Sequence, residues 1–505
     1  MLINLRYHTQ TPYLIHDFIS GGRIEAPPTP DSSLINDAQT TSYDLVPGKK
    51  YLFRIIAMSA FGAFNIQFED HKMTIVALDG VPSVPTEADY VTIAAGQRVD
   101  VMITAKDKPT KNYSILSKMT TSSFYNNGVL KYGSNLAAAT PVTSIRGNTA
   151  DDFNIQPLDK EPLLGTPTHS IQLDVSFSNV PNAGPRIKMG NYAYVTPKVP
   201  TLYTALSTGA DALNATVYGP ASNPYILNSG EIVEVTINNL DGFMHPIHLH
   251  GHRYQVVSRG QGSFNNKAKR QPDALFGAWG GKNKFAAAAA AATTNWNQNN
   301  NNNNNNNNNQ NSNQNSNSNS NNNNNQQNSN NNQQNSNSNS NSNSNNNNNN
   351  NNQNSNQNSN TAKTGSSSTA SASYSRPTAA QNFGGNRYSS GGQSASNVND
   401  ASLPAIPMKR DTVTTVPGGH LVIRFRADNP GVFVMHCHME WHVPAGMLVT
   451  FIEAPDQLQK TLTVPQSHYD MCKAQGIPTA GNCAGNTQNV YDVSQCRTAN
   501  INDWG

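Results

Sequence analysis

The chain has 505 residues, with 34 basic and 31 acidic side chains and a formal net charge of +3. So small a charge, with no basic stripe along the sequence, gives no indication of nucleic-acid binding. Hydrophobic residues make up only 36%, which is low for a globular chain. No apolar run approaches the roughly 20 residues of a membrane helix, and residues 1–6 lack the pattern of a signal peptide.

Short segments in which polar and apolar residues alternate predict β-strands along much of the chain. They are bounded by turns rich in Pro and Gly, such as Pro47-Gly48. The segments are Tyr51–Ala57, Val91–Ile93, Val99–Thr104, Glu231–Ile237 and Leu421–Arg426. This pattern is typical of all-β sandwiches and barrels. No long stretch of helical period competes with it.

A low-complexity tract interrupts the predicted strands. Every residue from Asn297 to Asn360 is Asn, Gln or Ser. Such a tract cannot bury enough apolar surface to offset its chain entropy, so we expect it to be disordered. It accounts for the low hydrophobic content. We interpret it as a tolerated loop expansion, because loop-closure cost grows slowly with length; a prion-like self-association role is the alternative.

Two histidine-rich segments lie on either side of this tract, HPIHLHGH at residues 245–252 and HCHMEWHVPAGM at residues 436–447. A blue copper site takes two His and one Cys in a plane, with a weak axial Met. Cys437, His442 and Met447 supply a thiolate, an imidazole and a thioether, and the first segment offers the second imidazole. One cysteine among several histidines and a methionine does not match a structural zinc site.

His436 and His438 flank the cysteine. On an extended strand, neighbouring side chains point to opposite faces. If Cys437 points at one copper, both flanking histidines point away from it, towards other metals. This covalent link suits an oxidase that accepts electrons one at a time and transfers several of them together to its final acceptor. A simple electron carrier is the alternative.

We expect two β domains, at residues 1–150 and at residues 165–259 plus 400–455. The second would be interrupted by a disordered insertion at residues 260–399 and followed by a tail at residues 456–505. Because both histidine-rich segments must meet at one metal site, the second domain has to close across the insertion, as a surface loop permits.

The two histidine-rich segments resemble the last two copper motifs of the multicopper oxidases. Outside the insertion, segments such as PKVPTLYTAL at 197–206, VIRFRADNPG at 422–431 and the tail at 468–487 are similar to the fungal iron-transport ferroxidases of that family. The resemblance implies tandem cupredoxin-like domains, which are Greek-key β-sandwiches. It also implies copper ligands: His245, Cys437, His442 and Met447 at the blue site, His248 at the normal copper, and His250, His436 and His438 at the paired coppers. His252 matches no ligand position.

For function, the resemblance implies that electrons pass from a reductant through the blue copper and Cys437, then through His436 and His438, to a trinuclear copper cluster that reduces dioxygen to water. Ferrous iron would be the reductant, as in fungal iron uptake, with an iron permease as partner and an extracellular or cell-surface location. A laccase-like enzyme with a phenolic reductant is the alternative.

Carboxylates near the blue site bear on the choice of reductant. Asp241 matches one acidic position of the ferroxidases and is expected to contact iron, or else to be a turn residue after Asn238-Asn239. The other two acidic positions fall at Leu5 and near residues 120–123, where no acid stands. The sequence therefore predicts a weaker iron preference than that of the ferroxidases.

The chain departs from the family pattern in one respect. The family's first domain carries two further His-x-His pairs, whereas His8, His16, His71 and His169 are isolated here. We expect an incomplete chain with a blue site and a partial trinuclear cluster, which alone does not reduce oxygen. A truncated gene model or a genuine two-domain protein would explain this, and a non-catalytic copper-binding or electron-transfer remnant is a third possibility.

Three cysteines, Cys472, Cys483 and Cys496, lie together in the tail. An odd number predicts either one disulfide plus a free thiol or a disulfide partner outside this chain. Either arrangement is compatible with an oxidising, secretory environment.

Overall fold

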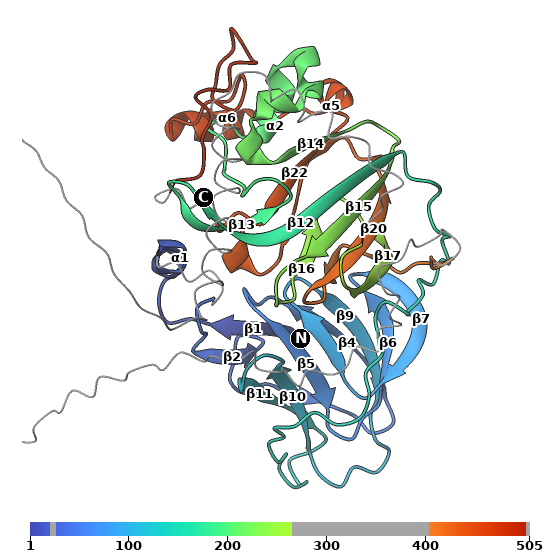
Figure 1. Cartoon of the computed structure of the whole chain (residues 1–505). Helices are drawn as coiled ribbons and strands as arrows, with labels where there is room; N and C mark the ends of the chain where they lie inside the picture. Colours follow the sequence, from blue (N-terminus) through green and yellow to red (C-terminus); the bar gives the residue numbers. More distant parts are fainter. Residues whose placement is uncertain (21–26, 265–402, 501–505) are drawn as a thin grey trace, which may run out of the picture. The chain divides into compact units, whose positions relative to one another are not determined.

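The computed structural model describes residues 1–20, 27–264 and 403–500 (Figure 1). Residues 297–360, and nearly all of the proposed insertion, lie outside the described residues. Strands dominate what is described, so the predicted all-β class is confirmed. The helices of the described segments are all too short or too polar to span a bilayer.

The first half of the chain forms a β-sandwich of a six-stranded and a five-stranded sheet. The order of the six strands is β2 (Ser32–Ile35), β1 (Leu2–Arg6), β4 (Lys50–Ala57), β9 (Arg98–Thr104), β6 (Met73–Leu78) and β7 (Val81–Ala88). The order of the five is β3 (Ser42–Asp44), β11 (Tyr125–Lys131), β10 (Tyr113–Met119), β5 (Ala63–Phe68) and β8 (Val91–Ala94).

The second half forms another sandwich with sheets of the same two sizes. Its six-stranded sheet has the order β13 (Gly184–Met189), β12 (His169–Val180), β15 (Ile232–Asn239), β20 (Gly419–Arg426), β17 (Tyr254–Gln261) and β18 (Lys409–Arg410). Its five-stranded sheet has the order β14 (Pro224–Leu227), β22 (Leu448–Glu453), β21 (Gly431–Cys437), β16 (Pro246–Leu249) and β19 (Thr412–Thr414).

The two sandwiches share one topology, strand for strand. Strands β5, β8 and β10 of the first correspond to β16, β19 and β21 of the second. In the first, Phe64 lies opposite Met119; in the second, Ile247 lies opposite Cys437. The next pair is Asn65 opposite Lys118 in the first and His248 opposite His436 in the second. Only the second sandwich therefore carries cysteine and histidine side chains at these register positions.

The five strands predicted from alternation are confirmed within two residues at each end, as β4, β8, β9, β15 and β20. The helices were not predicted. They are α1 (Thr11–Ser20), α2 (Thr201–Ser207), α5 (Pro455–Thr461), α6 (Gln466–Ala474) and the 3-10 turns η1 (Gly209–Leu213), η2 (Ala215–Tyr218), η3 (Pro220–Ser222) and η6 (Glu440–His442). The longest helix of the described residues, α1, has 10 residues, so its apolar face gives only a weak periodic signal.

Each sandwich has its own apolar core. Phe64 and Ile66 lie in the first, and Ile247 and Phe451 in the second. The proposed domain limits stay a prediction. The core of the first sandwich also includes Ile155 and Met408, which lie outside residues 1–150, the limits proposed for the first domain.

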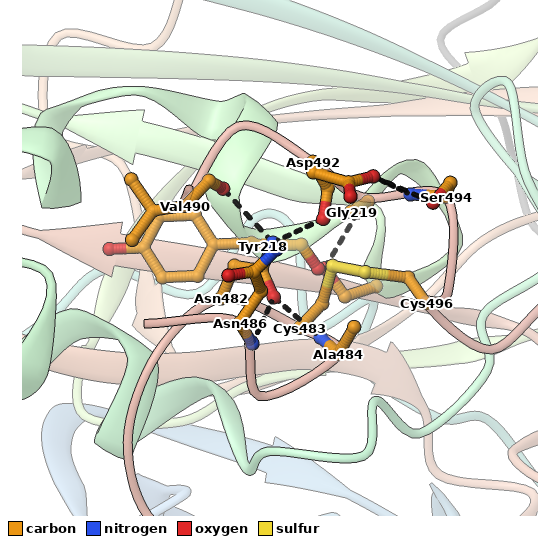
Figure 2. The surroundings of a disulfide bond; sticks show 11 residues. Tyr218, Gly219, Asn482, Cys483, Ala484, Asn486, Val490, Asp492, Ser494 and Cys496 are labelled. Atoms are coloured by element: carbon orange, nitrogen blue, oxygen red, sulfur yellow. Dashed lines mark hydrogen bonds between the residues drawn. A yellow bond between two sulfur atoms is a disulfide. The ribbon is translucent and has the colours of Figure 1, made fainter. Parts of the chain in front are cut away.

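The tail contains one disulfide, between Cys483 and Cys496, and Cys472 has a free thiol. This agrees with the prediction of one pair plus a free thiol. Figure 2 shows that the disulfide lies against Gly219. A Cβ at Gly219 would come within 2.7 Å of the Cys483 sulfur, so only glycine allows the tail to pack this closely.

Asn482, beside the disulfide, organises the tail around itself (Figure 2). Its side chain is fully buried. The amide group donates to the carbonyls of Val490 and Asp492 at 3.1 and 2.7 Å. The amide oxygen accepts from the N–H groups of Ala484 and Asn486, both at 3.0 Å. One side chain thus satisfies four backbone groups that no sheet or helix pairs.

A buried ion pair joins the two central strands of the second sandwich. Glu234 on β15 lies opposite Arg424 on β20, and the guanidinium Nε donates to the carboxylate at 2.7 Å. Each residue is only 3% exposed. Removing one partner would deprive the other buried charge of this close contact.

We therefore predict that Arg424→Met lowers the free energy of unfolding by about 3–5 kcal/mol, whereas the double variant with Glu234→Leu recovers most of that loss. Urea denaturation followed by circular dichroism measures both. Arg54→Met is the control, because Arg54 is 72% exposed and 3.8 Å from Asp100, so it should cost at most about 1 kcal/mol. Equal losses for Arg424→Met and Arg54→Met would contradict the prediction.

Candidate metal centre

Strands β16 and β21 bring the two histidine-rich segments together across the insertion. They are antiparallel, with Ile247 opposite Cys437 and His248 opposite His436. Because successive side chains of a strand point to opposite faces, Cys437 and His436 enter two different groups. We call His245, Cys437 and His442 the thiolate group, and His248, His250, His436 and His438 the histidine group.

The thiolate group converges on one small volume. The Sγ atom of Cys437 is 3.6 Å from Nδ1 of His245 and 3.4 Å from Nδ1 of His442. The two Nδ1 atoms are 3.2 Å apart. All three side chains are buried. The N–H of Met439 points at Sγ from 3.4 Å, so a backbone donor already faces the position of the thiolate charge.

The burial of this group fixes its charge in the absence of a cation. Desolvation raises the pKa of the Cys437 thiol. It also lowers the pKa of His442 well below its usual value, and the facing His245 lowers it further. The thiol is therefore protonated and His442 is neutral near pH 7, so a metal ion that binds here displaces the thiol proton.

Met447 lies in the turn that follows His442 and is fully buried. Its N–H donates to the carbonyl of His442 at 3.0 Å, and its carbonyl accepts from the N–H of Cys437 at 3.4 Å. Gly446 has a φ of +107°, and a Cβ there would lie 2.7 Å from Cβ of Ala193. The turn therefore requires glycine next to Met447, and it ties the methionine backbone to the backbone of His442 and of Cys437.

Asp241 contacts the thiolate group from outside. Its Oδ2 is 2.7 Å from Nε2 of His245, and its Oδ1 accepts from the N–H of Phe243 at 2.7 Å. The aspartate thus has a structural role in the turn after Asn238-Asn239, and its contact with iron stays a prediction. Asp241 also orients His245, because an acceptor at Nε2 keeps the proton there and leaves Nδ1 free for a metal.

The histidine group surrounds a second position. Nε2 of His250 and Nε2 of His436 are 3.2 Å apart. The ring centroids of His248 lie 5.6 Å from those of His436 and His438. Burial lowers the pKa of His250 and brings that of His436 to about 4, so these imidazoles are neutral and available as ligands. A cavity of about 650 Å³ opens beside His248 and His250.

Other histidines have different partners. His252 is 2.7 Å from the buried carboxylate of Glu453 and contacts the ring of Phe433, which agrees with a structural role. The isolated histidines that precede residue 241 make their contacts outside both groups. Their partners are Asp31 for His8, Asp17 for His16, Tyr132 for His71 and Glu231 for His169.

Two features escaped the sequence analysis. His248 donates through Nδ1 to the carbonyl of Asp411 at 2.8 Å. A cavity of about 590 Å³ reaches from Thr120 to Met244, beside His245, and its carboxylates come from Asp151 and Asp152. Both carboxylates pair with Arg259, at 2.5 and 2.7 Å. The residues in each of these contacts are far apart in the sequence, so no local sequence pattern indicates that they lie close together.

The donor chemistry of both groups fits copper. A buried thiolate with two imidazoles and a nearby thioether is the set that favours a blue copper site, and a cluster of neutral imidazoles also suits copper. The register positions of the first sandwich hold Asn65, Lys118 and Met119 instead. In the part of the chain that the structure describes, the second sandwich is therefore the one whose side chains fit copper.

We predict that loading one copper into the thiolate group at about pH 8 releases about one proton. The Cys437 thiol is the source, because its pKa is raised, while His442 is already neutral. Copper affinity should accordingly rise with pH. Calorimetry in buffers of different ionisation enthalpy counts the protons, with Cys437→Ser as the control that releases none. No proton, or two, for the wild-type chain would contradict these protonation states.

The fold and the donor sets together define a copper-binding protein of tandem cupredoxin-like sandwiches. Sequence models of the family described as multicopper oxidase match residues 6–136, and residues 194–279 with 284–457. The chain belongs to the multicopper oxidase family. The predicted family is thus confirmed, and with it copper as the cofactor.

Among its relatives is the iron transport multicopper oxidase fetC of Epichloe festucae, 30% identical over 97% of this chain and 60% of the relative. The crystal structure of Fet3p, a multicopper oxidase that functions in iron import, is 25% identical with a TM-score of 0.69, covering 99% of this chain and 74% of that one. A laccase from Botrytis aclada shares the fold at 18% identity, with a TM-score of 0.56 over 94% of this chain and 67% of the laccase. The chain spans about 60% of the length of the curated relatives it matches.

Proposed function

We propose that this chain is the electron-accepting part of a copper-dependent oxidase that takes electrons from ferrous iron and passes them towards dioxygen. The observation that carries the proposal is the placement of Cys437 between His436 and His438. The cysteine belongs to the thiolate group, and its two neighbours in sequence belong to the histidine group. Cys437 of the thiolate group is therefore joined by one peptide unit on each side to a histidine of the histidine group.

Bound copper supplies one-electron redox chemistry at the thiolate group and, in a cluster, the four-electron reduction of dioxygen to water. The protein's own residues set the conditions. His245, Cys437, His442 and Met447 would hold the blue copper, and their burial excludes water from it. Asp241 fixes the orientation of His245. His248, His250, His436 and His438 would provide part of a trinuclear cluster.

Four histidines make up about half of such a cluster, so we propose that the remaining ligands come from outside the residues of this chain. Metal affinity grows with the number and order of the ligands. Expressed alone, the chain should therefore bind the blue copper well and fail to turn over oxygen. A non-catalytic electron-transfer remnant is the competing proposal. Detectable oxygen uptake by the purified chain would contradict both that proposal and the expectation that ligands from outside this chain are needed.

Ferrous iron is the proposed reductant because relatives are named for iron transport and because Asp241 offers a hard oxygen beside His245. The support from other carboxylates is thin. Leu5 is buried in the core of the first sandwich, while Asp151 and Asp152 both pair with Arg259 and Asp152 also pairs with Arg410. A laccase-like preference has its own observation: Leu240 and Phe243, on either side of Asp241, are 54% and 42% exposed, which suits an aromatic reductant.

We further propose an extracellular or cell-surface location with an iron permease as partner. The disulfide between Cys483 and Cys496 supports an oxidising compartment. The permease would receive the ferric product, and nothing in the described residues identifies its docking surface.

The copper-loaded chain should absorb strongly near about 600 nm, as copper–thiolate sites do, and Cys437→Ser should abolish the band. The band requires the Cys437 sulfur because it arises from charge transfer between thiolate and copper. Cys472→Ser is the matched control, since Cys472 is the other free thiol of the described residues and should leave the band intact. A colourless wild-type protein with copper bound would refute the proposed blue site.

The choice of reductant can be tested without the oxygen site. Under anaerobic conditions, stopped-flow mixing measures how fast ferrous iron, or a phenol such as hydroquinone, bleaches the blue band. Asp241→Asn should lower the ratio of the iron rate to the phenol rate about 10-fold, because a charge-assisted contact is worth about 1.5–3 kcal/mol. Any change in the orientation of His245 affects both rates and cancels in the ratio.

Asp44→Asn is the control for net charge, since this carboxylate is 85% exposed on β3. An unchanged ratio in Asp241→Asn would mean that Asp241 acts only on His245. The laccase-like alternative would then be the better proposal.

A further inference from the structure

The turn between β8 and β9 of the first sandwich, residues 95–97, lies against the histidine group of the second. Gly96 has a φ of +79°, and a Cβ built there would lie 2.8 Å from Nε2 of His438 and nearer still to Cγ and Cδ2 of that ring. The ring cannot easily retreat, because the N–H of His438 is held by the carbonyl of Pro246 at 2.6 Å. Glycine at position 96 therefore leaves the space that the imidazole fills.

Arg98 follows this turn and reaches Asp411, the residue before β19. Its guanidinium makes a two-pronged contact with the Asp411 carboxylate, both distances being 2.6 Å. It is held in place by the carbonyls of Gly96 and Asp79, at 3.0 and 3.2 Å. Two parallel N–H···O bonds fix orientation as well as distance. Arg98 thus fixes the position of Asp411.

Asp411 transmits this contact to His248. Its carbonyl accepts from Nδ1 of His248 at 2.8 Å and from the N–H of Leu249 at 3.1 Å. The hydrogen bond at Nδ1 keeps the proton on that nitrogen, so Nε2 is the free ligand atom. Gln97 reinforces the same segment by donating to the carbonyl of Thr412 at 3.1 Å.

The shared topology of the sandwiches gives this arrangement a rationale. The turn after β19 corresponds to the turn after β8, and it supports the thiolate group: the N–H of Thr415 donates to the carbonyl of His245 at 2.8 Å. The second sandwich thus supports the thiolate group with its own turn. The equivalent turn of the first sandwich meets the histidine group instead, at His438 directly and at His248 through Arg98 and Asp411.

We propose that Gly96 and Arg98 are positioning residues for the histidine group, Gly96 by admitting the ring of His438 and Arg98 by fixing the Asp411 carbonyl that orients His248. The proposal rests on the proposed function, because it concerns copper binding by these histidines. The first sandwich, which lacks ligands at its own register positions, thereby takes part in building the copper site.

The test uses Gly96→Ala and Arg98→Gln in the full chain, labelled with ¹⁵N at histidine. In the metal-free protein, Gly96→Ala should shift the imidazole signals of His438, and Arg98→Gln should speed solvent exchange of the Nδ1 proton of His248. Assignments come from His438→Gln and His248→Gln. A role in folding alone would not move these two rings selectively.

Matched controls separate these effects from general strain. Gly230→Ala introduces the same positive-φ strain, since Gly230 has a φ of +82°, but a Cβ there would meet nothing within 4 Å. Arg54→Gln removes an exposed arginine of the sandwich that carries Arg98. Arg98→Lys keeps the charge without the two-pronged contact, so its effect should fall between wild type and Arg98→Gln, and it remains informative if Arg98→Gln folds poorly.

Copper provides the second measurement. Competition with a series of chelators should show about a 10-fold weaker affinity for copper beyond the blue equivalent in Gly96→Ala and Arg98→Gln, while the band near about 600 nm persists. Unchanged imidazole signals or equal copper affinities would overturn the proposal. A wild-type chain with no blue band would instead overturn the proposed function, and the imidazole signals of the metal-free protein would still decide the role of the turn.

Discussion

The antiparallel pairing of β16 with β21 is the constraint on which the copper chemistry depends. With Ile247 opposite Cys437, the alternation of side chains sends the cysteine into one group and His436 into another. A shift of one residue in this register would exchange the two faces and bury a histidine where the thiolate stands. The neighbouring strands β19 and β22 hold the pair on both sides, which makes such a shift costly.

Much of this could be predicted from the sequence. The ligands lie close together along the chain, as in residues 436–447, and their types identify the metal before any fold is known. The strands with clear alternation, such as β4 and β20, were also predictable, because period two survives in a half-buried sheet. What the sequence concealed was long-range: Arg98 and Asp411 are 313 residues apart, and no local pattern indicates that they meet.

The short elements were missed for a different reason. Helix α1 has 10 residues, and its residues Phe18 and Ile19 are buried in the core of the second sandwich, far along the chain from the strands they contact. Its stability comes from that packing rather than from intrinsic propensity. Asp241 is similar: its turn was foreseeable after Asn238-Asn239, but its contact with His245 depends on how the turn bends.

The strands of the second sandwich interleave segments from before and after the long insertion. Strand β15 pairs with β20, β16 with β21, and β17 with both β18 and β20. A single peptide-bond cut between residues 297 and 360 would therefore leave two fragments joined by a common core and six strand pairings, the four above together with β14–β22 and β16–β19. Neither fragment would contain a complete thiolate group, since His245 lies in one fragment and Cys437 in the other. Copper would then act as a crosslink between two polypeptides, and removal of the metal would weaken their association.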